Sequence, residues 1–175
     1  MEDDFHDIYR FHGRRPFRLD DEGIIDFIGV RENMSVLDVG GADGYYAEKM
    51  AARGAKVTII DAHEYNFKEL NGKGIRTIQQ NFCRGVEGNY SMVFMAHVYH
   101  DLVLTCKEKA LDAMKKVAPI FIANLDFVKE ELNFGPPSSI KLSKEEVVRD
   151  MESIGFLLKK EKEMPYHYLQ LFSKE

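Results

Sequence analysis

A short apolar segment that ends in an acid and continues into a glycine-rich turn lies in the first third of this chain. Residues 36–46 read VLDVGGADGYY, and an amphipathic segment follows them. The β-branched apolar run predicts a buried strand, and the amphipathic segment predicts a helix. Glycine lets the backbone adopt φ > 0 and approach a ligand closely, next to the free N–H groups of a helix N-terminus. The segment therefore predicts a ligand-binding strand–turn–helix unit.

The spacing of these glycines excludes two common phosphate-binding turns. A dinucleotide fingerprint needs glycines at i, i+2 and i+5, and neither Gly40 nor Gly41 starts such a series. No Gly-Lys-Ser/Thr follows either. Asp38 ends the predicted strand and Asp43 lies inside the turn. Two carboxylates beside a helix N-terminus would repel a pyrophosphate, but they suit a ligand with an ammonium group and no phosphate, such as S-adenosylmethionine.

Residues 38–44 (DVGGADG) resemble motif I of the class I S-adenosylmethionine-dependent methyltransferases, in which an acid and any residue precede Gly-x-Gly-x-Gly. Ala42 stands where the family has its middle glycine. The added methyl group is a mild change if φ at Ala42 is negative and a damaging one if φ is positive. The alternative interpretation is a strand–turn–helix corner that binds nothing.

The order of apolar segments predicts an α/β fold. The resemblance implies a Rossmann-like, doubly wound, mostly parallel seven-stranded sheet with one antiparallel C-terminal strand, in residues 35–175. Residues 1–34 are expected to form an N-terminal helical segment, and the resemblance implies a lid that includes Tyr9, Arg14 and Arg15; the alternative is a mobile or packing terminus. Strands are predicted at 35–39, 56–60, 76–80, 91–96, 120–125, 156–161 and 166–172, and helices at 20–30, 45–53 and 67–70. Two further helices are predicted to begin at capping boxes, at residues 105–108 and 143–146. Residues 83–90 leave little room for a crossover helix.

Three residues beyond the glycine turn are expected to bind the nucleoside part of the cofactor. Asp61 follows the strand 56–60, at the edge of the sheet where ligands of open α/β sheets lie, and is expected to accept hydrogen bonds from ribose hydroxyls. Its alternative role is a helix N-cap. The resemblance places Asn81 and Phe82 at the adenine, through the amide oxygen and through ring stacking.

Two histidines follow the predicted strand 91–96. The resemblance places His97 near the transferable methyl group, and on a helical turn His97 and His100 would share one side. An imidazole pKa near neutral pH suits a general base that deprotonates the methyl acceptor. The alternatives are that both histidines only cap and pack, or that they bind a metal with Asp101, for which local spacing supplies no third strong ligand.

The complete prediction for the site has two parts. The catalytic residues are His97 and His100, and no metal is expected. The cofactor-binding residues are Asp38, Gly40, Gly41, Asp43, Gly44, Asp61, Ala62, Asn81, Phe82 and His97. The segment 134–139 (FGPPSS) is expected to form a wall of the acceptor pocket or, alternatively, a plain surface linker.

Composition limits the class of function. The chain has 175 residues and a formal charge of −5, which does not suggest a general nucleic-acid surface. It contains no apolar stretch of about 18 residues and no signal peptide, so no membrane association and a cytoplasmic location are expected. Cys83 and Cys106 lack paired spacing, so both are predicted to be reduced, small apolar residues.

The resemblance implies methyl transfer to a small-molecule acceptor, as in the type 11 group that includes quinone-biosynthesis enzymes. Two alternatives stay open: a non-catalytic subunit that keeps the methyltransferase fold, and a protein or RNA methyltransferase that uses the arginines of residues 10–18. The acceptor atom and the oligomeric state are left undetermined.

Overall fold

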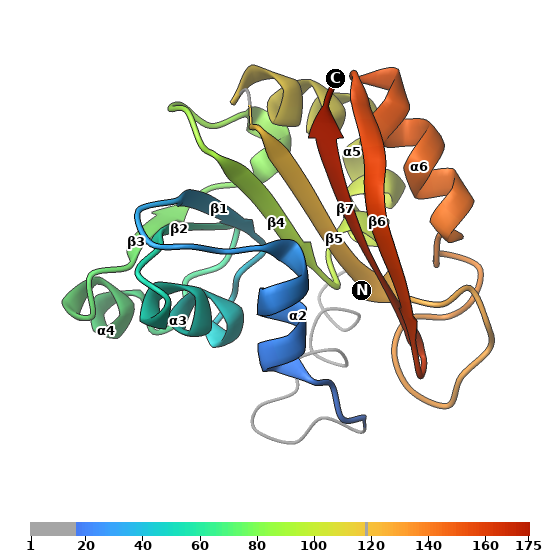
Figure 1. Ribbon diagram of the computed structural model, residues 1–175, viewed down its shortest axis with the longest axis horizontal. Coiled ribbons are helices and arrows are strands. Elements are labelled where there is room, and N and C mark those ends of the chain that lie inside the picture. Colours follow the sequence, from blue (N-terminus) through green and yellow to red (C-terminus); the bar gives the residue numbers. More distant parts are fainter. Residues whose placement is uncertain (1–16, 118) are drawn as a thin grey trace.

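The protein forms one seven-stranded sheet with helices on both faces (Figure 1). The structure is a computed structural model that describes residues 17–117 and 119–175. The strand order is β3-β2-β1-β4-β5-β7-β6, and β7 runs antiparallel to both of its neighbours, β5 and β6. The strands are β1 (Ser35–Val39), β2 (Lys56–Asp61), β3 (Arg76–Gln79), β4 (Met92–Ala96), β5 (Phe121–Phe127), β6 (Phe156–Met164) and β7 (His167–Lys174). This architecture confirms the predicted fold.

Two hydrophobic cores lie on opposite faces of the sheet. One contains buried side chains of α2 (Asp21–Ile28), α3 (Tyr45–Ala52) and α4 (Phe67–Gly72). The other contains those of α5 (Tyr99–Lys116) and α6 (Lys144–Ser153). Covering both faces explains why the central strands are continuous apolar runs rather than alternating ones. Because β1, β2, β4 and β5 run parallel to one another, their carboxyl ends lie at the same end of the sheet, where the candidate site is found.

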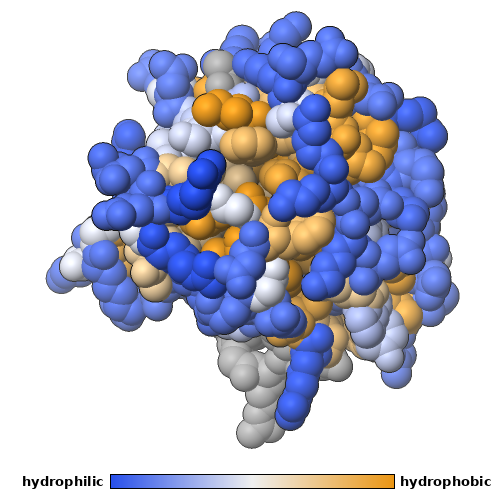
Figure 2. Space-filling view, in the orientation of Figure 1, coloured by the Kyte–Doolittle hydropathy of each residue, from blue (hydrophilic) through white to orange (hydrophobic). Residues whose placement is uncertain are grey.

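The edge strand β6 carries a run of exposed charges at residues 159–163 (KKEKE). Charges on an edge strand discourage pairing with another chain. Hydrophilic residues cover most of the face shown in Figure 2, and hydrophobic residues reach its surface mainly in the centre and upper right. Among the described residues, no helix combines the length and apolar character that crossing a membrane requires.

One of the two predicted capping boxes is correct. The Ser143 hydroxyl accepts a hydrogen bond from Glu146 N (3.1 Å), and the Glu146 carboxylate accepts one from Ser143 N (2.7 Å). At the other, the helix begins earlier, at Tyr99, and the Thr105 hydroxyl donates instead to the carbonyl oxygen of Asp101 (2.8 Å). A threonine inside a helix can donate its hydroxyl hydrogen bond to the carbonyl oxygen four residues earlier, so a threonine in such a pattern does not always mark the start of a helix.

The cysteines are paired, contrary to the prediction from sequence. Cys83 lies in the short 3-10 helix η1 (Phe82–Arg84), the only helix between β3 and β4, and a disulfide joins it to Cys106 of α5. Their Cα atoms are 6.1 Å apart, although 23 residues separate them in sequence. The packing of η1 against α5 brings them together, and local spacing contains no signal for such a contact. The absence of a full crossover helix between β3 and β4 agrees with prediction.

Candidate functional site

In the turn between β1 and α3, every second residue from 40 to 44 adopts the left-handed backbone conformation. Gly40, Ala42 and Gly44 have φ values of 68°, 49° and 85°. Gly40 N donates to the carbonyl oxygen of Ile60 (2.8 Å), and Gly44 N donates to that of Gly41 (2.9 Å). These bonds fix the turn against the end of β2, so the glycines are required by the backbone and not only by ligand approach.

Ala42 is strained by this conformation. An alanine at positive φ costs about 1 kcal/mol relative to glycine. We therefore expect Ala42→Gly to raise the free energy of unfolding by about 1 kcal/mol in urea denaturation. The same substitution at Ala51, inside α3, should lower it by about 1 kcal/mol. A loss of stability in Ala42→Gly would contradict this account of the turn.

Asp38 lies buried beneath the turn. Its side chain is 2% exposed, and a Cβ added to Gly41 would lie 2.7 Å from its Oδ2 atom. Oδ2 has no hydrogen-bond partner among the described residues. Burial, together with repulsion from Asp61 and Asp43, raises the pKa of Asp38 well above its usual range. A nearby cation would remove this penalty, so the site favours a positively charged ligand.

Asp61 faces the glycine turn from the end of β2. Its Oδ2 accepts a hydrogen bond from Ala42 N (3.1 Å), and its Oδ1 accepts one from His63 N (3.0 Å). The N-cap of the following helix, α4, is Asn66, so the alternative role of Asp61 as that helix's cap is wrong. Each carboxylate oxygen keeps further acceptor capacity for a ligand hydroxyl.

The remaining predicted cofactor residues lie around this turn and on the loops beside it. Asp43 is exposed, and its Oδ1 accepts from Tyr45 N (3.3 Å). Ala62 is also exposed. Asn81 is exposed and caps η1 by accepting a hydrogen bond from Cys83 N (2.9 Å). Phe82, by contrast, is 4% exposed and packs into the core on the α5 side, so its stacking on a purine stays a prediction.

His97 directly follows β4 and belongs to a cluster of rings. It has φ of 58°, and its ring centroid lies 4.7 Å from that of Phe127 and 4.9 Å from that of His167. Phe17 lies 5.8 Å from His97 and 5.7 Å from Phe134. Rings from the N-terminal segment, the ends of β4 and β5, the β5–α6 connection and the start of β7 therefore meet at one place. We call Phe17, His97, Phe127, Phe134 and His167 the ring cluster.

The ring cluster adjoins the glycine turn. A Cβ added to Gly40 would lie 2.7 Å from the Cγ2 atom of Val98, the residue next to His97. Sequence reasoning named residues 134–139 as a pocket wall and the N-terminal segment as a lid, but it assigned no role to Phe17, Phe127 and His167. The predicted lid residues Tyr9, Arg14 and Arg15 lie outside the described residues, as does Arg10.

His100 is buried and held by Asp126, a residue to which the sequence assigned no role. Its Nδ1 lies 2.9 and 3.0 Å from the two carboxylate oxygens of Asp126, and both side chains are 2% exposed. Burial alone would lower the pKa of His100, but the charge of Asp126 and its hydrogen bond raise it. Burial alone would raise the pKa of Asp126, but His100 lowers it. The Asp126 carboxylate therefore favours the charged form of His100, and it occupies the Nδ1 atom of this imidazole.

No group of histidine, cysteine and acidic side chains within residues 17–117 and 119–175 is arranged to hold a metal ion.

Sequence comparison does not identify a family for this chain, because no protein-family model and no curated protein matches it.

Solved structures do match. A SAM-dependent methyltransferase from Aquifex aeolicus is similar with a TM-score of 0.77 and 27% identity, over 87% of this chain and 88% of that one. A protein described as a type 11 methyltransferase from Sulfolobus solfataricus has a TM-score of 0.74 and 18% identity, over 90% and 92% of the two chains. The chain therefore has the fold of the class I S-adenosylmethionine-dependent methyltransferases, and many of the structures similar to it are enzymes of this class.

A third similar structure is the 1,6-didemethyltoxoflavin-N1-methyltransferase of Burkholderia thailandensis, with a TM-score of 0.69 and 15% identity, over 88% of this chain and 76% of that one. It was crystallised with its acceptor and S-adenosylhomocysteine. In the protein described here, the buried oxygen of Asp38 beside the turn, which has no hydrogen-bond partner among residues 17–117 and 119–175, fits the positively charged end of such a cofactor.

Proposed function

We propose that this methyltransferase transfers the methyl group of S-adenosylmethionine to a small-molecule acceptor. The observation that carries the proposal is the pair of acids, Asp38 and Asp61, on either side of the left-handed turn at residues 40–44. S-adenosylmethionine supplies a methyl group already activated by its sulfonium. The protein's part is to bind, to orient and to exclude water.

Each residue around the turn has one proposed role. Asp38 and Asp43 balance the positive charge of the methionine end, directly or through water. Asp61 accepts hydrogen bonds from the ribose hydroxyls, and Asn81 accepts one from the adenine amino group. Gly40 keeps the turn against Val98, so that the methyl group is directed toward the ring cluster.

The ring cluster supports a flat acceptor. Phe17, Phe127 and His167 are buried and pack against the two partly exposed rings, His97 and Phe134, which can contact a ligand at the rim of β4 and β5. A ring pair adds about 0.5–1.5 kcal/mol beyond the burial of its area. The Burkholderia neighbour crystallised with 1,6-didemethyltoxoflavin supports an acceptor of small-molecule size in this fold.

The two histidines receive different roles in this proposal. The pairing of His100 with Asp126 supports a fixed cation that positions the rim. His97, which is part of the ring cluster and only partly buried, stays the candidate general base. With an identified acceptor, His97→Gln should slow single-turnover methyl transfer by about 100-fold if the acceptor must lose a proton. An unchanged rate in His97→Gln would contradict general-base catalysis by His97.

Transfer of labelled methyl groups to a panel of small molecules tests the function. We expect label in small aromatic alcohols, amines or thiols, and an approximately tenfold higher KM for them in Phe17→Ala. Leu104→Ala, an exposed change on α5, should leave KM unaltered. Label found only in protein or RNA would favour that alternative. Cofactor binding without transfer to any acceptor would favour a non-catalytic subunit.

A further inference from the structure

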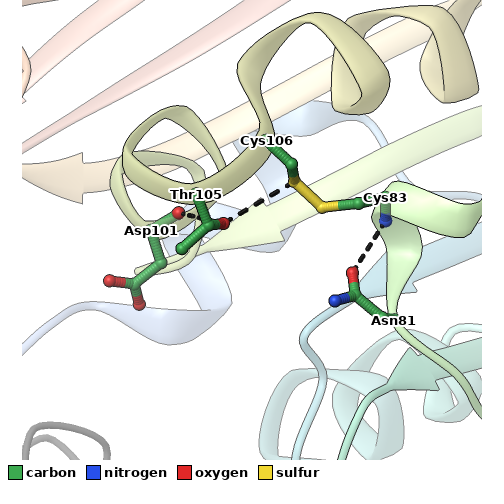
Figure 3. The surroundings of a disulfide bond; sticks show 5 residues. All are labelled: Asn81, Cys83, Asp101, Thr105 and Cys106. Carbon is green, nitrogen blue, oxygen red and sulfur yellow. Dashed lines mark hydrogen bonds between the residues drawn. A yellow bond between two sulfur atoms is a disulfide. The ribbon is translucent and has the colours of Figure 1, made fainter. Parts of the chain in front are cut away.

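A single covalent cross-link joins the loop that follows β3 to the helix that follows β4. The disulfide between Cys83 and Cys106 lies between Asn81 on one side and Asp101 on the other (Figure 3). Both cysteines are only partly buried, so a small thiol reagent can reach this region. Both segments that it joins contribute predicted site residues.

On the cofactor side, the cross-link fixes the segment 80–85. The amide oxygen of Asn81 accepts its hydrogen bond from the backbone N–H of Cys83 itself (2.9 Å). The Gln80 side chain donates to the carbonyl oxygen of Gly85, which closes the segment. Phe82 is buried in the core beneath it. The orientation of Asn81 therefore depends directly on where Cys83 is held.

On the acceptor side, the cross-link joins α5 at its one departure from helical geometry. Cys106 has φ of −160° and ψ of 41°, which separates the first turns of the helix, carrying His100 and Asp101, from the rest. The Thr105 hydroxyl donates to the carbonyl oxygen of Asp101 (2.8 Å) and lies 3.6 Å from the Sγ atom of Cys106. The sulfur is thus connected to the segment that carries the buried histidine.

We propose that the Cys83–Cys106 disulfide is a reversible redox site that sets the affinity for the cofactor; this inference rests on the function proposed above. A dithiol reductant breaks the S–S bond: two electrons and two protons convert it into two thiols, and the reductant becomes a cyclic disulfide. Without the cross-link, segment 80–85 has more conformational freedom, and ordering it again on binding costs free energy. The reduced protein therefore binds the cofactor more weakly.

Calorimetric titration with S-adenosylhomocysteine tests this proposal on the full chain. Oxidised protein is compared with protein reduced by dithiothreitol, and alkylation with mass measurement confirms the thiol state of each sample. We expect a dissociation constant about five- to tenfold higher after reduction, restored on reoxidation by oxidised glutathione. Cys83→Ser should bind like reduced wild type and should not respond to dithiothreitol.

The double variant Cys83→Ala/Cys106→Ala provides the matched control, and circular dichroism verifies its fold. It should bind like reduced wild type under both conditions. Equal affinity of the oxidised and reduced wild-type protein, or resistance of the bond to dithiothreitol in the folded protein, would overturn the redox proposal. No binding in either state would instead overturn the proposed methyltransferase function.

Discussion

Replacing Asp126 with alanine is expected to lower the free energy of unfolding by about 3–5 kcal/mol at about pH 6, because it removes the buried carboxylate that faces Nδ1 of the buried His100 and leaves only the more distant Asp101, 3.6 Å from Nε2. Urea denaturation followed by circular dichroism measures this loss. As a control, Asp112→Ala removes an acid whose ion pair with Lys116 is exposed (2.8 Å), and its effect should stay below about 1 kcal/mol.

The effect of Asp126→Ala should also depend on pH. The folded pKa of Asp126 is lowered, so its contribution is present above the unfolded aspartate pKa and is lost as pH falls through the folded value. The folded pKa of His100 is raised, so its contribution is present below the unfolded histidine pKa and is lost as pH rises through the folded value. The difference between wild type and variant is therefore largest between about pH 4 and 6.5. A difference independent of pH would contradict a charged pair.

Replacing Asp38 with asparagine is expected to have opposite effects on stability and on cofactor binding. Burial and neighbouring acids make the ionised Asp38 unfavourable in the folded protein, so the neutral amide should raise the free energy of unfolding at neutral pH by about 1 kcal/mol. The same change removes the negative charge that faces the cofactor, and affinity for S-adenosylmethionine should fall by about 30-fold or more.

The pH dependence of stability tests this explanation of the Asp38→Asn effect. Its folded pKa is raised, so folding is favoured when the carboxyl is protonated, and the penalty in wild type grows as pH rises from the unfolded value through the folded one. The stability gain of Asp38→Asn should therefore vanish in acid. Asp43→Asn, at an exposed position of the same turn, should leave stability nearly unchanged. A destabilised Asp38→Asn would show that the carboxylate is satisfied in the free protein.

Features of this fold that depend on residues near in sequence were predictable. Buried parallel strands need continuous apolar runs, and the rule that ligands lie at the carboxyl ends of strands placed Asp38 and Asp61 at one edge. Strand limits were less accurate: β6 extends to Met164 and β5 to Phe127, because antiparallel pairing with β7 continues through Asp126, Lys162 and Glu163, residue types that do not favour strands.

Features that depend on distant residues were not predictable. His100 and Asp126 are 26 residues apart, and their pairing follows from the neighbouring positions of β4 and β5 in the sheet. The disulfide and the ring cluster likewise join segments that only the folded chain brings together. For Ala42, the sequence showed what a positive or a negative φ would mean, but only the structure shows that φ is positive.

Calorimetric titration of the wild-type protein and of Asp61→Ala with S-adenosylmethionine tests the central claim most directly, with Glu152→Ala, an exposed change on α6, as the control for lost charge. We predict saturable one-site binding to the wild type and to Glu152→Ala, and an affinity about 100-fold lower in Asp61→Ala. No binding to the wild type at millimolar ligand, or equal affinity in Asp61→Ala, would contradict a cofactor site at this turn.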